Sequence, residues 1–242
     1  MTQRADFVDL FLKGQVALVT GASGGIGESA AMTLAALGAD ARVEPVRQRI
    51  AEQGHRVTGW ECDIRSRSAI FEMVAGVERE MGPISVLVNN AGIDIPQAAL
   101  EVTEQAWDDI VGTNLKGMFF CSQAVGRGMT SRRYGQIINL ASEMSFVAAP
   151  PYSVYAISKA GVAQLTKALA VEWAPANVRV NALAPTLVTT PMMEDLFRGD
   201  PAGLKAWVWA GWRSRATWLT PSRFWRQRTG AVLPVDGGRL AG

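Results

Sequence analysis

Short apolar runs punctuate the chain, and each is followed by a stretch in which apolar residues recur at helical spacing. Val16–Val19 is uninterrupted, whereas residues 84–88 and 137–140 each contain one polar residue and residues 178–183 contain two. Runs of this length are typical of strands that are covered on both faces, as in parallel sheets. Strands that alternate with helices predict an α/β fold, a doubly wound parallel sheet in one domain spanning residues 1–242.

The second strand is the exception to this pattern. Residues 41–46 form a short, charged segment interrupted by Pro45, which a central strand does not tolerate. We expect a helix over residues 46–53, then a strand over residues 57–62 that ends at Asp63 and Ile64. The pattern therefore predicts an atypical second strand at this edge of the sheet.

Three helices are expected further along the chain. Ser66 can cap a helix that runs to about Met81. A long helix is expected over residues 104–129, with Asn114 among its apolar positions. A buried Asn with a satisfied amide is the ordinary explanation, and a catalytic or water-holding Asn is the alternative. A third helix carries Tyr155 and continues to Trp173.

Composition narrows the possible functions. The chain has 242 residues, a formal charge of +2, two cysteines and one histidine, which leaves no Cys/His metal cluster and gives no argument for nucleic acid. No apolar run approaches the ~20 residues that span a bilayer. Residues 1–13 resemble a short leader without the apolar core of a secretory signal. We expect a cytoplasmic protein with free thiols and without membrane or metal.

A glycine-rich turn follows the first strand directly. Residues 20–27 read Thr-Gly-Ala-Ser-Gly-Gly-Ile-Gly and lead into an Ala-rich helix. Glycines let a backbone approach a pyrophosphate, and a helix N-terminus offers N–H groups and a positive dipole. The context predicts a dinucleotide-binding turn, with a purely structural turn as the alternative. Asn90 and Gly92, after the strand over residues 84–88, suit contact with a cofactor ribose.

Candidate chemistry is concentrated between Ser142 and Lys159. Tyr155 and Lys159 are four residues apart, so on a helix they share one face. An ammonium beside a phenol favours the phenolate and lowers its pKa from about 10. Ser142, arriving from the preceding strand end, can hold an alcohol or carbonyl oxygen. Such a set can transfer protons for an alcohol/ketone pair without a metal, although Tyr–Lys pairs also occur on exposed helices without function.

Taken in order, these motifs resemble the short-chain dehydrogenase/reductase family, which has a Rossmann-like fold. The resemblance covers residues 14–200 and 229–238. It depends on the following residues: Thr20, Gly21, Gly25, Gly27, Asp63, residues 89–92, Asn114, Ser142, Tyr155, Lys159 and the strand end at residues 181–185. Residues 232–238 are similar to the closing strand of the family.

The resemblance implies a role for each matching residue. Tyr155 is expected to be the general acid or base, and Ser142 to hold the substrate oxygen. Lys159 is expected to lower the pKa of Tyr155 and bind the nicotinamide ribose, and Asn114 to anchor a water that relays protons to Lys159. Asp63 and Ile64 are expected to flank the adenine. The remaining expected cofactor contacts are Gly21, Ser23, Gly25, Ile26, Gly27, Asn90, Gly92, Pro185, Val188 and Thr190.

The cofactor implied by the resemblance is NAD or NADP. In this family the end of the second strand chooses between them, through an acidic residue for NAD or basic residues for NADP. Because that strand is shortened here, neither Asp40, Arg42, Glu44 nor Arg47 can be assigned the choice.

The segment over residues 207–229 does not resemble the family. It is rich in Trp and Arg and has no acidic residue. Its aromatic and basic residues are Trp207, Trp209, Trp212, Trp218, Trp225, Arg213, Arg215, Arg223, Arg226 and Arg228. One interpretation is a substrate lid of altered structure. Another is a basic aromatic patch that binds an anionic substrate or single-stranded nucleic acid. We favour a locally shifted reading frame, because the composition changes abruptly at both edges.

The sequence thus predicts an oxidoreductase that transfers hydride between NAD(P) and a secondary alcohol or ketone of polyol, sugar, 3-oxoacyl or steroid type. The alternative is a non-catalytic dinucleotide-binding protein. Residues 10–14 resemble those of sugar-acid and polyol members. Glu143 is unusual after Ser142, and pointing into the pocket it would disfavour anionic substrates. A homodimer or homotetramer is expected, weakened by the atypical segment over residues 190–229.

Overall fold

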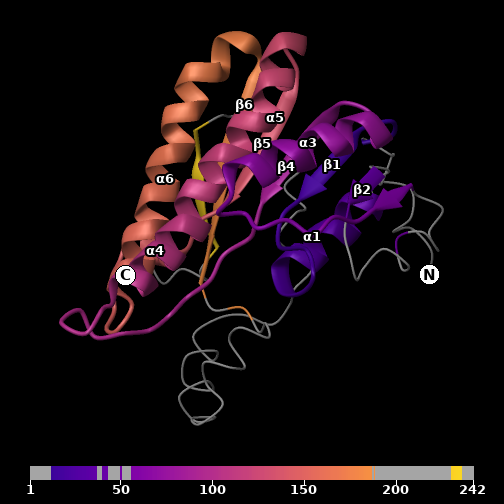
Figure 1. The fold of residues 1–242 in the computed structure, drawn as a ribbon. Helices are drawn as coiled ribbons and strands as arrows, with labels where there is room; N and C mark the ends of the chain where they lie inside the picture. The colour runs from indigo at the N-terminus through magenta and orange to yellow at the C-terminus, as the bar shows by residue number, and fades with distance from the viewer. Residues whose placement is uncertain are drawn as a thin grey trace, which may run out of the picture.

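The strands form a single parallel sheet, which lies among its helices in Figure 1. The computed structural model describes residues 12–36, 40–42, 50, 56–186, 188 and 230–235. Its seven strands lie in the order β3-β2-β1-β4-β5-β6-β7. Their bounds are β1 Val16–Val19, β2 Asp40–Arg42, β3 Val57–Thr58, β4 Ile84–Asn89, β5 Gly135–Leu140, β6 Val178–Pro185 and β7 Val232–Val235. The strand order reverses between β1 and β4, which is where ligands bind in doubly wound sheets. The predicted fold class is confirmed.

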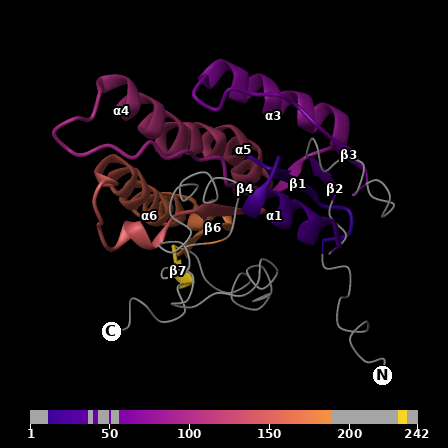
Figure 2. The same cartoon turned by 90° about the horizontal axis from the view of Figure 1, so that it is seen from below.

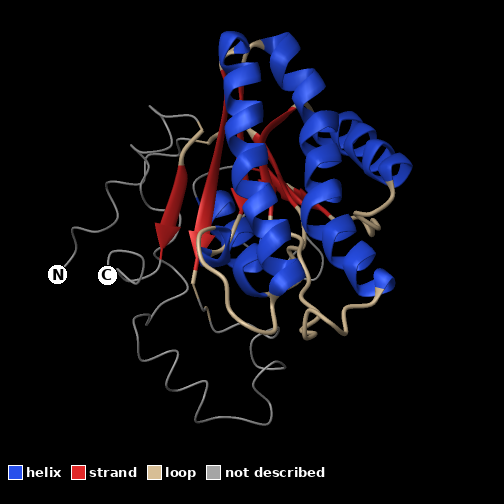
Figure 3. Cartoon of the chain, turned by 90° about the vertical axis from the view of Figure 1, so that its left-hand side faces the viewer, coloured by secondary structure: helices blue, strands red, loops and turns tan. Residues whose placement is uncertain are grey.

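Helices cover both faces of this sheet, as Figures 2 and 3 show. The helices are α1 Gly25–Ala36, α3 Arg67–Met81, α4 Glu104–Val111, α5 Met118–Arg132 and α6 Ser153–Trp173. The buried residues of α3, α5 and α6 pack together on one face, and those of α1 pack with Ile50 on the other.

The first strand shows how the sequence produces these layers. Side chains alternate across a strand, so Val16 and Leu18 join the cluster beneath α3 and α5. Ala17 and Val19 join the cluster beneath α1. Because both faces are covered, all four residues are buried, which explains the uninterrupted apolar run.

A chain of buried polar side chains fixes the two central strands to the helices above them. The Asn89 amide on β4 donates to Ser122 Oγ at 2.9 Å and to Asn139 Oδ1 at 3.0 Å. The Asn139 amide on β5 donates in turn to Thr166 Oγ1 at 3.0 Å on α6. Buried amides cost stability unless they are bonded, so this chain specifies how α5 and α6 sit on the sheet.

The atypical second strand is present but short. β2 comprises Asp40–Arg42 and pairs in parallel with both β1 and β3. The next strand, predicted over residues 57–62, is confined to Val57–Thr58. Val57 and Thr58 pair with Ala41 and Arg42 of β2. Because β2 ends at Arg42, residues 59–62 extend beyond the sheet. Ser66 caps α3 as expected, its Oγ accepting from Ala69 N at 3.3 Å.

The long helix predicted over residues 104–129 is divided in the structure. Between α4 and α5 lies a π-helical turn, Gly112–Gly117. A Cβ on Gly117 would stand only 2.5 Å from the carbonyl oxygen of Ile64. The glycine thus lets this turn approach the loop after β3. π-Turns inside α-helices occur frequently at functional sites.

Several predictions concern residues outside the described ranges. These are most of the leader (1–11), most of the helix over residues 46–53, and the segment over residues 190–229. Within the described residues, no helix has the length and apolar character needed to cross a bilayer. Neither Cys62 nor Cys121 forms a disulfide, and Cys121 is buried.

Candidate active site

The glycine-rich turn between β1 and α1 is bound to the end of β4. Thr20 Oγ1 accepts from the backbone of Asn90 at 3.0 Å and of Ala91 at 3.1 Å. The Asn90 amide donates to Gly21 O at 2.8 Å. Gly21 has a φ of 60°, and a Cβ there would stand 2.8 Å from the Cα of Ala91. The turn therefore requires glycine, and Asn90 shapes it through the peptide of Gly21.

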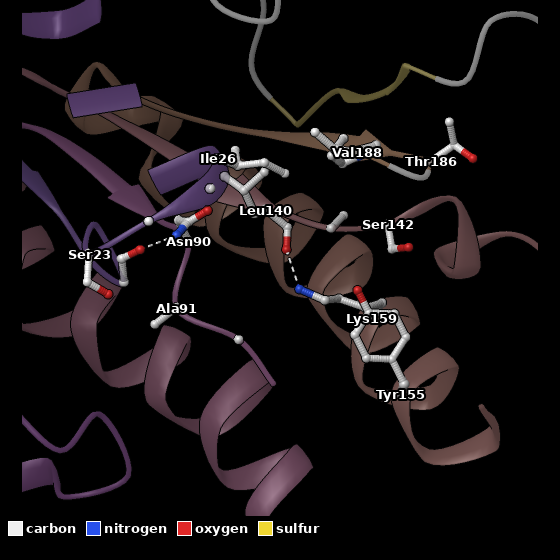
Figure 4. Close-up of a pocket in the computed structure, with 16 residues that line it drawn as sticks. Ser23, Ile26, Asn90, Ala91, Leu140, Ser142, Tyr155, Lys159, Thr186 and Val188 are labelled. Atoms are coloured by element: carbon white, nitrogen blue, oxygen red, sulfur yellow. Dashed lines mark hydrogen bonds between the residues drawn. The ribbon is translucent and has the colours of Figure 1, made fainter. Parts of the chain in front are cut away.

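A cavity of about 440 Å³ opens at the carboxyl ends of β1, β4, β5 and β6. Figure 4 shows its lining, with the turn and Asn90 on one side and Ser142, Tyr155 and Lys159 on the other. Strand ends distant in sequence meet here, so the predicted phosphate turn and the predicted proton-transfer residues share one cavity. Its predicted residues are Gly21, Ser23, Gly25, Ile26, Asn90, Gly92, Ser142, Tyr155, Lys159, Pro185 and Val188.

Tyr155 and Lys159 lie one turn apart on α6 and face the cavity together. The Lys159 ammonium is 5.6 Å from the centroid of the Tyr155 ring. Its Nζ donates to the carbonyl oxygen of Leu140 at 2.8 Å, the bond drawn in Figure 4. The ammonium is thus fixed between the end of β5 and the phenol.

Burial has the largest effect on the pKa values of Tyr155 and Lys159. It raises the pKa of Tyr155 to about 12; a hydrogen bond with Ser142 lowers this pKa, while Asp94 and Glu143 raise it. Burial lowers the pKa of Lys159 to about 8. The expected lowering of the Tyr155 pKa by Lys159 stays a prediction. At neutral pH Tyr155 holds its proton, because desolvation disfavours the phenolate.

Ser142 stands at the start of a short turn that a neighbouring serine fixes. Ser142 Oγ accepts from Met144 N at 3.2 Å, and Ser142 N donates to Ser145 Oγ at 3.3 Å. Ser145 Oγ donates to Lys159 O at 2.7 Å. The hydroxyl of Ser142 is therefore held in register with Lys159 and Tyr155.

Asn114 lies in the π-helical turn, and its amide bonds are satisfied. Its Oδ1 accepts from Ile93 N at 2.8 Å, and its Nδ2 donates to Ile93 O at 2.9 Å. Nδ2 also donates to Ser158 Oγ at 3.1 Å, and Ser158 Oγ donates to Tyr155 O at 2.7 Å. Asn114 thus connects the loop after β4 to the helix that carries Tyr155. It lies behind the cavity wall.

A second hollow of about 270 Å³ adjoins the cavity beyond the glycine turn. Its walls include Trp60, Cys62, Ile64 and Met73, and it shares Gly21, Ser23 and Ala91 with the first. The side chains of Trp60, Ile64 and Met73 give this hollow apolar walls that suit an aromatic base. Ile64, which was expected to flank the adenine, lines it.

Asp63, by contrast, faces another hollow. Its carboxylate is bound by Arg65, whose Nε lies 3.1 Å from Asp63 Oδ1, and Arg65 also reaches Asp109 at 2.6 Å. The hydrogen bond from Arg65 lowers the pKa of Asp63. Asp63 therefore closes the loop that presents Ile64.

Two further predicted residues are absent from the described lining of the cavity. Gly27 lies beneath the turn, against the carbonyl of Gly21, and Thr190 is outside the described residues.

Five residues that the sequence analysis passed over contribute to the site. Leu140 accepts from Lys159, while Ser145 and Ser158 position α6. Trp60 lines the second hollow, and Asp94 acts electrostatically on both Tyr155 and Lys159. Ser145 and Ser158 carry no pattern of their own in sequence. The signal for Asp94 was a charged residue two positions after the motif at residues 89–92.

Residues 15–201 match the protein-family model described as short chain dehydrogenase. Gluconate 5-dehydrogenase of Gluconobacter oxydans is 35% identical over 249 residues, which cover 95% of this chain and 96% of that protein. NAD-dependent glycerol dehydrogenase of Listeria innocua is 32% identical over 213 residues, 86% of this chain and 80% of that protein.

The fold has similar solved structures. A gluconate 5-dehydrogenase from Burkholderia cenocepacia J2315, in complex with NADP and tartrate, superposes with a TM-score of 0.90. It is 28% identical, and the match covers 96% of this chain and 98% of that one.

Proposed function

The chain belongs to the short-chain dehydrogenase family, and we propose that its cavity joins Tyr155, Ser142 and Lys159 to a nicotinamide for alcohol/ketone chemistry. The protein is an oxidoreductase that uses NAD or NADP on CH–OH groups. The observation that supports the assignment of roles is the shared cavity, which the glycine turn and the proton-transfer residues line together.

The two adjoining hollows suit the shape of a dinucleotide. The N-terminus of α1 follows the Cβ-free turn at Gly21 and offers N–H groups to the pyrophosphate. The hollow with Trp60 and Ile64 would hold the adenine, and Lys159 with Val188 would hold the nicotinamide end. When bound, the nicotinamide supplies or accepts the hydride.

Side chains of the protein transfer the proton. Ser142 would hold the substrate oxygen beside Tyr155. In ketone reduction Tyr155 donates its proton to that oxygen as negative charge develops there; in alcohol oxidation it accepts the proton. Its pKa of about 12 makes it a protonated acid at neutral pH. Lys159 compensates the negative charge left on the phenol oxygen, and Asn114, behind Ile93, would hold a water that returns protons to Lys159.

The pH dependence of reduction follows from these two groups. Tyr155 keeps its proton up to about pH 12, whereas Lys159 loses its charge through about pH 8. Without that charge the phenolate is harder to form, so kcat/KM for reduction should be level below pH 8 and fall about tenfold per pH unit above it. Steady-state rates from pH 6 to 10 check this, and a level profile to pH 10 would contradict it.

Within the activity, we infer a substrate of polyol or sugar type. The relatives named for gluconate and glycerol support this class, as does the sequence over residues 10–14.

We also propose a cytoplasmic protein, without membrane or nucleic-acid partner, that forms a homodimer or homotetramer. Large apolar side chains exposed on α4, α5 and α6 support self-association: Trp107 (40%), Phe119 (38%) and Val171 (79%). Light scattering of the purified chain tests it; a monomer at micromolar concentration would refute it.

Parallel fluorescence titrations with NADH and NADPH test the proposed site. We expect binding of at least one cofactor in the micromolar range, with quenching of tryptophan emission because Trp60 lines the adjoining hollow. The tighter cofactor is then used for a screen of polyols and sugar acids. Folded protein that binds neither cofactor would refute the proposed function.

A further inference from the structure

The loop between β3 and α3 forms one wall of the second hollow. Residues 59–66 belong to no strand or helix, and Trp60, Cys62 and Ile64 line the hollow of about 270 Å³ that adjoins the catalytic cavity. Pairing of β3 with β2 ends at Thr58. The position of this wall therefore depends on contacts that the loop makes beyond the sheet.

The loop lies across the π-helical turn that carries Asn114. A Cβ on Gly117, at the end of that turn, would be 2.5 Å from the carbonyl oxygen of Ile64. A Cβ on Gly112, at its start, would be 3.6 Å from Cγ of Arg65. The loop is thus packed on the backbone at both ends of the turn, and glycine at each end leaves room for it.

Arg65 adds polar bonds to this packing. Its Nε and Nη2 each lie 3.1 Å from a carboxylate oxygen of Asp63, in bidentate geometry, and its backbone N–H donates to Asp63 Oδ1 at 2.9 Å. Its Nη1 donates to Asp109 Oδ1 on α4 at 2.6 Å. One guanidinium therefore connects the loop to α4. We call these bonds from Arg65 to Asp63 and Asp109 the Arg65 bridge.

The Arg65 bridge differs from an ordinary surface ion pair. Exposed pairs contribute little to stability on their own, whereas bidentate pairs and networks of charges contribute more. Here two carboxylates share one guanidinium, and the hydrogen bond from Arg65 lowers the pKa of Asp63, so both partners are charged at neutral pH. Without Arg65, the carboxylates of Asp63 and Asp109 would repel each other, and the loop would move away from α4.

We propose that Arg65 is a positioning residue for the cofactor: through the Arg65 bridge it fixes residues 60–64 against α4, and it thereby sets the affinity for the adenosine half of the dinucleotide. The proposal rests on the proposed function, since it places the adenine in the second hollow. Arg65 itself lines a separate polar hollow with Asp63 and Asp109, so its effect on the dinucleotide is indirect. Tyr155 lies on α6, which the Arg65 bridge does not touch, and the chemical step should not depend on Arg65.

Arg65→Met tests the proposal, because it removes the guanidinium and keeps an aliphatic side chain beside Gly112. Calorimetric titration with AMP reports the adenosine half alone; adenosine 2′,5′-bisphosphate replaces AMP if the chain prefers NADPH. We expect the Kd for this nucleotide and for the preferred NAD(P)H to rise at least about fivefold. The KM for the cofactor should rise with them, while kcat at saturating cofactor stays within about twofold of the wild type.

Two further variants separate the Arg65 bridge from charge alone. Arg65→Lys keeps the charge and loses the planar fork, so its AMP affinity should lie between those of the wild type and Arg65→Met. Arg132→Met is the matched control, because it removes another arginine that joins two elements, through an ion pair of 3.6 Å between α5 and Glu78 of α3. Its AMP affinity should equal that of the wild type.

Asp109→Asn, alone and combined with Arg65→Met, tests whether the two residues act through one contact. Alone it weakens the bond to α4, and the Kd for AMP should rise about threefold. In the Arg65→Met background it removes the repulsion between Asp63 and Asp109, so it should lower the Kd or leave it unchanged. Losses that multiply in the double variant would show that the residues act independently, and would overturn the proposal.

The variants should fold, with Tm within about 4 °C of the wild type, because the Arg65 bridge lies at the surface. Unchanged AMP affinity in folded Arg65→Met would overturn the proposal and leave the proposed function intact. If the wild type binds NAD(P)H but transfers no hydride, the proposed function fails, while the AMP affinities still decide the role of Arg65. A folded wild type that binds neither dinucleotide nor AMP would refute both.

Discussion

Replacing Tyr155 by Phe should lower turnover by about 10²–10⁴-fold, the usual contribution of general acid–base catalysis, in both directions. The ring and its contact with the Lys159 ammonium remain, so the cavity keeps its shape. What disappears is the hydroxyl, which holds the proton at neutral pH because burial raises its pKa to about 12. Steady-state rates with the preferred cofactor measure the loss. NAD(P)H affinity from fluorescence titration should change by no more than about threefold.

Tyr134→Phe is the matched control, because it removes a phenol hydroxyl from a residue that follows α5 and is 43% exposed. That variant should retain the wild-type rate. A Tyr155→Phe enzyme that keeps more than a tenth of the wild-type kcat would show that another group transfers the proton.

Gly27→Ala should destabilise the fold and abolish cofactor binding together. A Cβ at this position would overlap the carbonyl of Gly21 and the Asn90 amide, which are themselves hydrogen-bonded at 2.8 Å. Overpacking of this kind costs about 1–3 kcal/mol, and each kcal/mol lowers Tm by about 2–4 °C in a chain of this size. Because the displaced carbonyl belongs to the turn that we propose to bind the pyrophosphate, we expect NAD(P)H affinity to fall at least about tenfold.

Gly24→Ala serves as the control for stability, since a Cβ there meets no protein atom within 4 Å. Its Tm, measured by calorimetry, should stay within about 2 °C of the wild type. If Gly27→Ala has the same Tm as Gly24→Ala and still binds NAD(P)H, the close packing of the turn against Asn90 is not required for stability or for cofactor binding.

The sequence alone was sufficient to predict that helices cover both faces of the sheet and that the candidate site residues lie together at one edge. Val16–Val19 is uninterrupted because both of its faces are covered, and Ser142 with Tyr155 could be assigned to one edge because parallel strands end together. The division of the long helix was not predictable. Residues 112–117 keep helical spacing in sequence, and only the close approach of Ile64 to Gly117 reveals why a π-turn is accommodated there.

Protonation was the least predictable property of the site. Spacing places Lys159 beside Tyr155, but spacing carries no information about desolvation, which has the largest effect on the pKa of Tyr155 and raises it. Asn114 illustrates the same limit in hydrogen bonding. Its apolar neighbours predict burial, yet its partners Ile93 and Ser158 come from distant segments.

Transfer of deuterium from [4-²H]NAD(P)H to dihydroxyacetone, the ketone that corresponds to glycerol, is the most direct test of the central claim. Mass spectrometry of the product should show one deuterium on the carbinol carbon, from a single face of the nicotinamide, with wild-type protein and with Tyr134→Phe. Tyr155→Phe should give about 10²–10⁴-fold less labelled product. Folded protein that binds the cofactor yet transfers no deuterium to this or any other polyol-type ketone would contradict the claim and would identify a dinucleotide-binding protein without catalysis.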